Sequence, residues 1–163
     1  MLGVVLYQPE IPPNTGNIIR LCAAVGATLH LIEPLGFHFD DKTLRRAGLD
    51  YHALTKVLRH PSYAALVATT SPARRMIALT THGAQSLYAF QFKRDDLLLF
   101  GAETSGLPAH VRDEIPMSHQ LRIPMRAACR SLNLANAVAI ALYEALRQCD
   151  PSSRAPHLAP AVS

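Results

Sequence analysis

The sequence has few of the features that mark secreted, membrane-spanning or metal-binding proteins. Its three cysteines are odd in number and form no C-x-x-C pair, which argues against a disulfide framework and against a zinc site. No apolar run reaches about 18 residues, and residues 1–16 lack the basic-then-apolar pattern of a signal peptide. No two histidines stand in an H-x-x-x-H pattern, so metal catalysis has little support. These absences predict a protein of the reducing cytoplasm with no metal and no membrane anchor.

Charged residues are also scarce, at 17% of the chain, whereas 49% of the residues are hydrophobic. A chain of 163 residues with this composition fits one well-packed domain, which we place at 1–149. Residues 150–163 are rich in Pro, Ser and Ala, and we expect a disordered tail there.

Among 16 basic residues only Lys42, Lys56 and Lys93 are lysines. The arginine excess weakly favours a polyanionic partner, because guanidinium matches phosphate geometry.

Short apolar runs alternate with helix-like segments along the chain, the pattern of an α/β fold with a mainly parallel sheet flanked by helices. The expected strands are 2–7, 28–32, 56–59, 75–80, 97–100 and 121–124. The expected helices are one capped by Asn14 that runs through Val25 and is closed by Gly26, a basic one over 42–47, one over 63–67, a short one starting at Pro108, and a long one over 132–147.

The last helix has an unusually wide apolar face. One stripe at helical spacing consists of Leu134, Val138, Ala141, Leu142 and Ala145. More apolar residues flank this stripe, so the face is wider than a surface helix needs. The helix is therefore either buried in the core of a monomer or packed against a second subunit, and the pattern alone fits both.

The first of three segments that could carry chemistry runs from Asn14 to Arg20. It lies between a strand and a helix, where open α/β sheets place their ligands. Asn17 and Arg20 are three residues apart and share a helical face. Gly16 would let a ligand approach the backbone closely. The alternative is an N-cap followed by a solvent-facing arginine.

The second segment, 101–108, has the sequence GAETSGLP and directly follows the expected strand 97–100. Its two glycines, Gly101 and Gly106, with Glu103 between them, predict a cradle lined by backbone groups. No Gly-Lys-Ser/Thr follows, so a triphosphate site is disfavoured. A tight turn with a surface glutamate would give the same sequence.

The third segment, 123–136, leads into the last helix. Ser131 is well placed to cap that helix. Asn133 and Asn136 are separated by one helical turn on an otherwise apolar face. Because buried amides need hydrogen-bond partners, the two asparagines together indicate a polar site or an interface.

Taken in order, NTGNIIR (14–20), FGAETSGLP (100–108) and IPM…RSLNLANAVAIALYEA (123–145) resemble the three motifs of the SPOUT-class methyltransferases. The stretches YQPEIPPNTGNIIRLCA and DDKTLRRAGLDYH are similar to the smallest subfamily of that class, whose members are tRNA (cytidine/uridine)-2′-O-methyltransferases acting at the wobble nucleotide. The resemblance covers roughly residues 1–149.

The resemblance implies a deep trefoil knot near the C-terminus, a homodimer formed by the first and last helices, and S-adenosyl-L-methionine as methyl donor. It also implies that the dimer surface itself holds the anticodon region of tRNA. The implied donor-binding residues are Leu79, Thr80, Gly101, Gly106, Ile123, Met125, Ser131 and Leu132. The implied catalytic residues are Arg20, Asn14, Glu103 and Asn133. Our hypothesis is that Arg20 anchors a phosphate and orients the attacking oxygen. A guanidinium group keeps its proton at neutral pH and therefore cannot take a proton as a base.

The chain departs from the resemblance at Ala102, at Ser105 and at residues 127–129, where the subfamily often has Pro, Arg and a Pro-Asp-Ser stretch. These are loop changes that could alter donor affinity or RNA contacts, and they leave Glu103 and Asn133 in place. Two alternative functions stand beside the main one: 2′-O-methylation of another tRNA position or of rRNA, and RNA binding by a relative that has lost catalysis.

Overall fold

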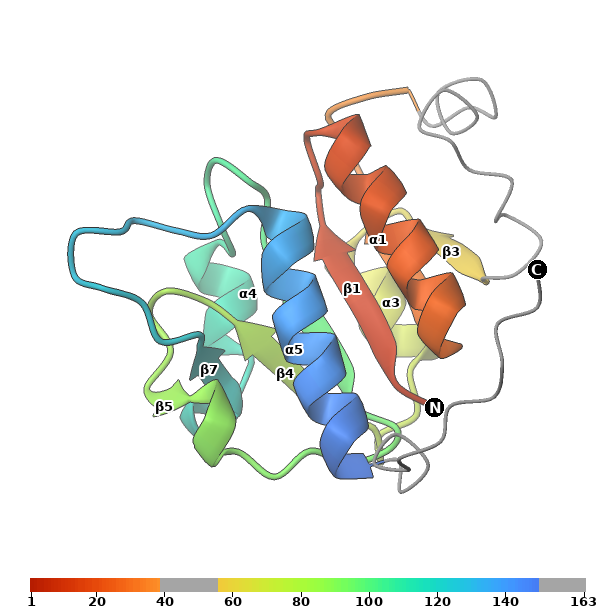
Figure 1. The fold of residues 1–163 in the computed structure, drawn as a ribbon. Coiled ribbons are helices and arrows are strands. Elements are labelled where there is room, and N and C mark those ends of the chain that lie inside the picture. Colours follow the sequence, from red (N-terminus) through yellow and green to blue (C-terminus); the bar gives the residue numbers. More distant parts are fainter. Residues whose placement is uncertain (39–55, 150–163) are drawn as a thin grey trace, which may run out of the picture.

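The computed structural model describes residues 1–38 and 56–149 and contains a seven-stranded sheet with helices on both faces (Figure 1). The strands are β1 (Gly3–Tyr7), β2 (Thr28–Ile32), β3 (Val57–His60), β4 (Met76–Leu79), β5 (Gln85–Ser86), β6 (Leu97–Phe100) and β7 (Gln120–Arg122). The helices are α1 (Pro12–Val25), α3 (Tyr63–Thr69), α4 (Ala109–Asp113) and α5 (Leu134–Cys149), with 3₁₀ turns at Leu87–Ala89 and Met117–His119. The basic helix predicted over 42–47 and the predicted tail 150–163 lie outside the described residues.

Every strand pairing in the sheet is parallel, and the strand order is β3-β2-β1-β6-β4-β7-β5. The carboxyl ends of all strands therefore point to the same edge. The chain runs outward from β1 to β3 and then crosses to the other side of β1, so the direction of winding reverses beside β1 and β6. Open α/β sheets bind ligands outside the carboxyl ends at such a reversal. The predicted mainly parallel sheet is confirmed.

Each face of the sheet is buried under a pair of helices, and α1 and α5 lie side by side on one of them (Figure 1). The core on that face includes Ile18, Ile19 and Cys22 of α1 and the whole predicted stripe of α5: Leu134, Val138, Ala141, Leu142 and Ala145. The core on the other face joins α3 and α4 to strand residues such as Val5, Ala78 and Leu99. Burial on both faces explains why the strands are continuous apolar runs instead of alternating patterns.

The start of α1 differs from the prediction. The N-cap is Ile11, whose side chain makes no capping hydrogen bond, and prolines follow at the first two helical positions. Proline is favoured there because its missing N–H needs no partner in the first turn and its fixed φ is already helical. Asn14 therefore lies inside the helix, and the prediction that it caps α1 is wrong. The predicted end is confirmed, since Gly26 is left-handed with φ 68°.

The start of α5 also differs from the prediction. The helix begins at Leu134, and the Oδ1 atom of Asn133 accepts hydrogen bonds from the backbone N–H groups of Ala135 at 2.9 Å and Asn136 at 3.3 Å. Asn133 is thus the capping residue, and the prediction that Ser131 caps the helix is wrong. Asn133 and Asn136 are both exposed, so the expected burial of the two amides is not found.

The ends of the other described helices and strands differ from the predicted ones by at most three residues. The two-residue strand β5 and the two 3₁₀ turns were not predicted. Within the described residues, no helix is long and apolar enough to cross a membrane. The trefoil knot stays a prediction.

Candidate active site

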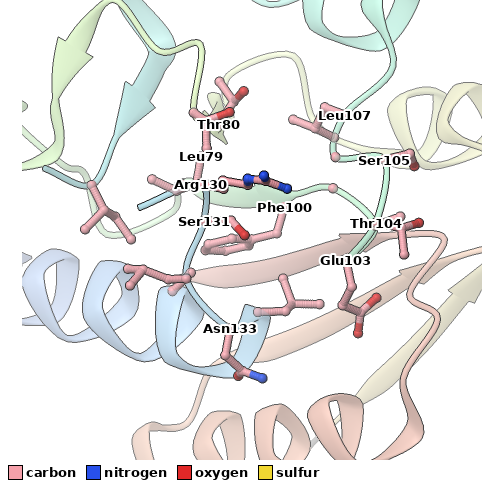
Figure 2. A pocket seen from close by; sticks show the side chains of 18 of the residues that line it. Leu79, Thr80, Phe100, Glu103, Thr104, Ser105, Leu107, Arg130, Ser131 and Asn133 are labelled. Atoms are coloured by element: carbon pink, nitrogen blue, oxygen red, sulfur yellow. The ribbon is translucent and has the colours of Figure 1, made fainter. Parts of the chain in front are cut away.

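A cavity of about 660 Å³ opens at the carboxyl ends of β4 and β6. Three segments that are far apart in the sequence form most of its wall: 79–82, 100–107 and 123–134. Ile11 and Asn14 contribute from the start of α1, and Arg112 contributes from α4. Figure 2 shows side chains of all three segments directed toward a common space. The volume lies within the usual range of small-molecule sites, about 300–1,000 Å³.

The structure brings eleven of the twelve predicted site residues to this cavity. The cavity is lined by all eight predicted donor-binding residues, Leu79, Thr80, Gly101, Gly106, Ile123, Met125, Ser131 and Leu132, and by Asn14, Glu103 and Asn133. Arg20 is the exception, because it does not line the cavity of its own chain. It lies exposed on α1, six residues after Asn14, which is about 9 Å further along the helix axis and on a different face.

The loop 101–106 is a compact turn in which Gly101 lies directly against Gly106. The Gly106 N–H donates to the Ala102 carbonyl at 2.9 Å, and Gly106 has a positive φ of 69°. A side chain on Gly101 would collide with the backbone of Gly106 and Leu107. The two predicted glycines are therefore needed to fold the loop, whether or not a ligand also contacts them.

A chain of hydrogen bonds joins Glu103 to the start of α1 and the start of α5. The Glu103 carboxylate accepts from the backbone N–H groups of Glu10 at 2.8 Å and Ile11 at 3.2 Å, and from Nδ2 of Asn14 at 3.1 Å. Asn14 Oδ1 in turn accepts from Nδ2 of Asn133 at 2.9 Å. Because Ile11 has no side-chain cap, Glu103 supplies from another loop the negative charge that a helix N-terminus favours.

Twelve lining residues were not among the predicted site residues, and two of these, Arg112 and Arg130, are arginines. Arg130 belongs to the same motif as Ser131, so the sequence held a signal for it, whereas nothing local marks Arg112. Figure 2 shows the Arg130 side chain reaching into the cavity. Glu103 is the one carboxylate among the residues that line the cavity, and its oxygens already accept hydrogen bonds from α1. The two guanidinium groups thus favour a ligand that has an anionic group, such as a carboxylate or a phosphate.

Within the ranges 1–38 and 56–149, no three His, Cys, Asp or Glu side chains are grouped so as to hold a metal ion. The prediction that the reaction needs no metal stays a prediction.

Known proteins are similar to this chain in sequence and in fold. Residues 1–143 match the model of the SpoU rRNA Methylase family. A tRNA (cytidine(34)-2'-O)-methyltransferase of Polaromonas sp. (strain JS666) is 56% identical over 149 residues, which cover 91% of each chain. A solved structure described as giving insight into the 2-OH methylation of C/U34 on tRNA has a TM-score of 0.86 and 49% identity, covering 91% of this chain and 95% of that one.

A more distant structure contains the methyl donor. The SpoU methyltransferase AviRb from Streptomyces viridochromogenes, in complex with AdoMet, has a TM-score of 0.76 and 33% identity. The match covers 91% of this chain and 57% of AviRb.

Proposed function

The chain belongs to the SpoU methylase family, and we propose that it transfers a methyl group from S-adenosyl-L-methionine to the ribose 2′-OH of nucleotide 34 of tRNA, a cytidine or a 5-modified uridine. The observation that carries this proposal is the convergence of 79–82, 100–107 and 123–134 on one cavity at the reversal of the sheet. Relatives of nearly the same length that act at nucleotide 34 support the choice of substrate.

The residues of the cavity fit the methyl donor chemically. Leu79, Ile123 and Leu132 offer an apolar wall that suits an adenine ring. Thr80, Ser131 and the backbone of the 101–106 loop offer hydrogen-bonding groups that suit a ribose and an amino-acid moiety. The bound donor supplies a methyl group on a cationic sulfur, which is already a good leaving group. The main task of the protein is therefore to align the 2′-oxygen with that methyl group.

The position of Arg20 supports a site shared between two copies of the chain. Arg20 lies on the exposed side of α1 together with Asn17 and Ala24, and α5 beside it exposes Tyr143, whose relative exposure is 52%. A second copy packed on α1 and α5 would cover these residues and would bring Arg20 of one copy to the cavity of the other. There, Arg20 would bind a phosphate and orient the 2′-hydroxyl, while Asn14, Glu103 and Asn133 form the polar wall.

Mixing inactive variants tests the shared site. We expect Arg20→Ala and Asn133→Ala each to lose most single-turnover activity, and we expect co-refolded mixtures of the two to regain part of it. Mixed dimers would then contain one cavity with both native residues. No regain in mixtures, together with a monomeric mass in analytical ultracentrifugation, would rule out the shared site.

The proposal also includes a single domain over 1–149 and a cytoplasmic location, which rest on composition and on the cysteine pattern, and a trefoil knot, which rests on the family resemblance alone. The function itself is tested by mass mapping of tRNA methylation in cells with and without the gene, with purified rRNA as a second substrate pool. A methyl group that appears at another nucleotide would favour the first alternative function. A protein that binds tRNA and shows no heat on titration with S-adenosylmethionine would favour the second.

A further inference from the structure

A second carboxylate, Glu10, connects the 101–106 loop to α1 by hydrogen bonds of its own. Glu10 precedes α1, and Thr104 lies at the middle of the 101–106 loop, 94 residues away. The Thr104 backbone N–H donates to Glu10 Oε2 at 3.0 Å, and the Thr104 hydroxyl lies 2.8 Å from each oxygen of the same carboxylate. Glu10 does not line the cavity, so it has no direct access to a ligand there.

The contacts between the two segments are reciprocal. Glu103 accepts from the backbone of 10–11, and Glu10 accepts from the backbone of Thr104. Each segment therefore contributes one carboxylate and at least one backbone N–H to the other. We call this set of hydrogen bonds the Glu10–Glu103 clasp. Because hydrogen bonds to carboxylates are short and strong, the clasp fixes both the distance and the orientation of the two segments.

The Glu10 side of the clasp is supported from behind. Gly36 N–H donates to the Pro9 carbonyl at 2.9 Å, and a Cβ on Gly36 would lie 2.8 Å from the Cα of Glu10. Residue 8 is also tied to the sheet, because Gln8 N–H donates to the Ile32 carbonyl at 3.0 Å. The residues before α1 thus have little room to move away from the 101–106 loop.

We infer that Glu10 and Thr104 are positioning residues for the methyl transfer, an inference that rests on the proposed function. The 101–106 loop belongs to the donor cavity, whereas α1 carries Asn14, part of the polar wall that would face the acceptor in the same cavity. In-line transfer depends on the relative placement of these two parts, and an error of about 1 Å can slow a reaction roughly a hundredfold. Glu10 acts on that placement from outside the cavity, through Thr104, whereas Thr104 and Glu103 themselves line the cavity.

The test compares Glu10→Gln, Thr104→Val and the conservative Thr104→Ser, with Glu114→Gln on the exposed end of α4 as a matched control for the charge change. Two quantities are measured on the full chain: the single-turnover rate with saturating tRNA and S-adenosylmethionine, and the Kd for S-adenosylhomocysteine by calorimetry. Thermal unfolding checks that every variant is folded.

We expect Glu10→Gln and Thr104→Val to lower the rate by about tenfold or more, with a change in Kd below about threefold. Thr104→Ser keeps the hydroxyl and should stay near the wild-type rate, as should Glu114→Gln. The double variant Glu10→Gln/Thr104→Val should be no slower than the slower single variant, because the two residues act as one unit.

Rates within twofold of wild type for Glu10→Gln, or a Thr104→Ser variant as slow as Thr104→Val, would overturn the inference. A fall in rate matched by an equal loss of affinity would also overturn it, because the clasp would then act on donor binding alone. A wild-type protein that methylates no RNA would remove the proposed function and this inference with it. An active wild type with an equally active Glu10→Gln variant would remove the inference alone.

Discussion

The two ends of strand β6 each have a carboxylate, and the two are held in opposite ways. Asp96, just before the strand, is fully buried and forms an ion pair with Arg75 through two contacts of 2.8 and 2.7 Å. It also accepts from the Lys93 N–H at 2.8 Å. Glu103, just after the strand, accepts only from neutral donors that belong to a segment about 90 residues away.

This difference separates residues that stabilise the fold from residues that organise the site. At the amino end of β6, the charge of Asp96 is balanced by Arg75, which directly precedes the neighbouring strand β4, so the pair stays local to the start of these two strands. At the carboxyl end, Glu103 joins the 101–106 loop to the start of α1. Within the part of the chain that the structure describes, no ion pair links Arg112 or Arg130 to a carboxylate that lines the cavity. We therefore expect isosteric changes at the two ends to separate stability from activity.

The largest expected effect is on stability, at Asp96. In Asp96→Asn, the guanidinium of Arg75 loses its counter-charge, and the new amide presents N–H groups to existing donors. Removing one partner of a buried ion pair costs about 3–5 kcal/mol, and because Arg75 is partly exposed we expect about 3 kcal/mol. Urea unfolding measures this loss, and the methylation rate of the folded fraction should stay near the wild-type value. A stable variant with a reduced rate would contradict the comparison.

A second effect on stability comes from acid, through a buried histidine far from the cavity. His30 is 7% exposed, and its Nδ1 lies 3.0 Å from Nε2 of His60. Burial, and then the positive charges of His60, Arg74 and Lys56, lower the pKa of His30 to about 4. Burial also lowers the pKa of His60. The unfolded chain therefore binds a proton between pH 6.5 and about 4 that the folded chain does not bind.

Stability should accordingly be highest above pH 6.5 and fall as the pH drops toward 4, by about 3 kcal/mol for His30 alone. Urea unfolding at a series of pH values measures the slope. His30→Gln removes the titrating group and should flatten the slope, whereas His110→Gln, at an exposed position of α4, should leave it unchanged. An unchanged slope in His30→Gln would show that other groups cause the acid sensitivity.

Glu103→Gln is the matched counterpart of Asp96→Asn, with the smaller effect on stability. The new amide keeps one acceptor oxygen and turns N–H groups toward existing donors, so about 1–2 kcal/mol should be lost. The single-turnover rate should fall by about tenfold or more, because α1 and the 101–106 loop lose their alignment. Asp96→Asn serves as the control in the same assays. A Glu103→Gln variant with full activity would show that the carboxylate organises nothing that the reaction needs.

The sequence was sufficient to predict the sheet, the α5 core stripe and the three segments that line the cavity, since these depend on local patterns and on the resemblance. The helix starts were wrong for a physical reason. Asn14 and Ser131 are good N-cap residues in isolation. However, α1 already begins at Pro12, and Asn133 is the residue that caps α5. The Glu10–Thr104 contact joins residues 94 positions apart, and no local signal links them.

The placement of Arg20 shows a second reason why a sequence motif does not fully predict which residues line a site. Closeness in a motif does not give closeness in a site, because six residues along a helix turn a side chain to another face. The positions of the other site residues agree with the expectation, whereas all the assigned roles stay predictions.

The smallest expected effect concerns which residue caps α5, and it separates the predicted cap from the observed one. Asn133→Ala removes the acceptor for the N–H groups of Ala135 and Asn136, so it should cost about 1 kcal/mol of stability. Ser131→Ala removes an exposed hydroxyl that makes no capping bond, and its unfolding free energy should stay within about 0.5 kcal/mol of wild type. Asn133→Asp keeps the acceptor oxygens and should restore the cap, although it loses the donor to Asn14. A loss of about 1 kcal/mol in Ser131→Ala with none in Asn133→Ala would place the cap at Ser131 after all.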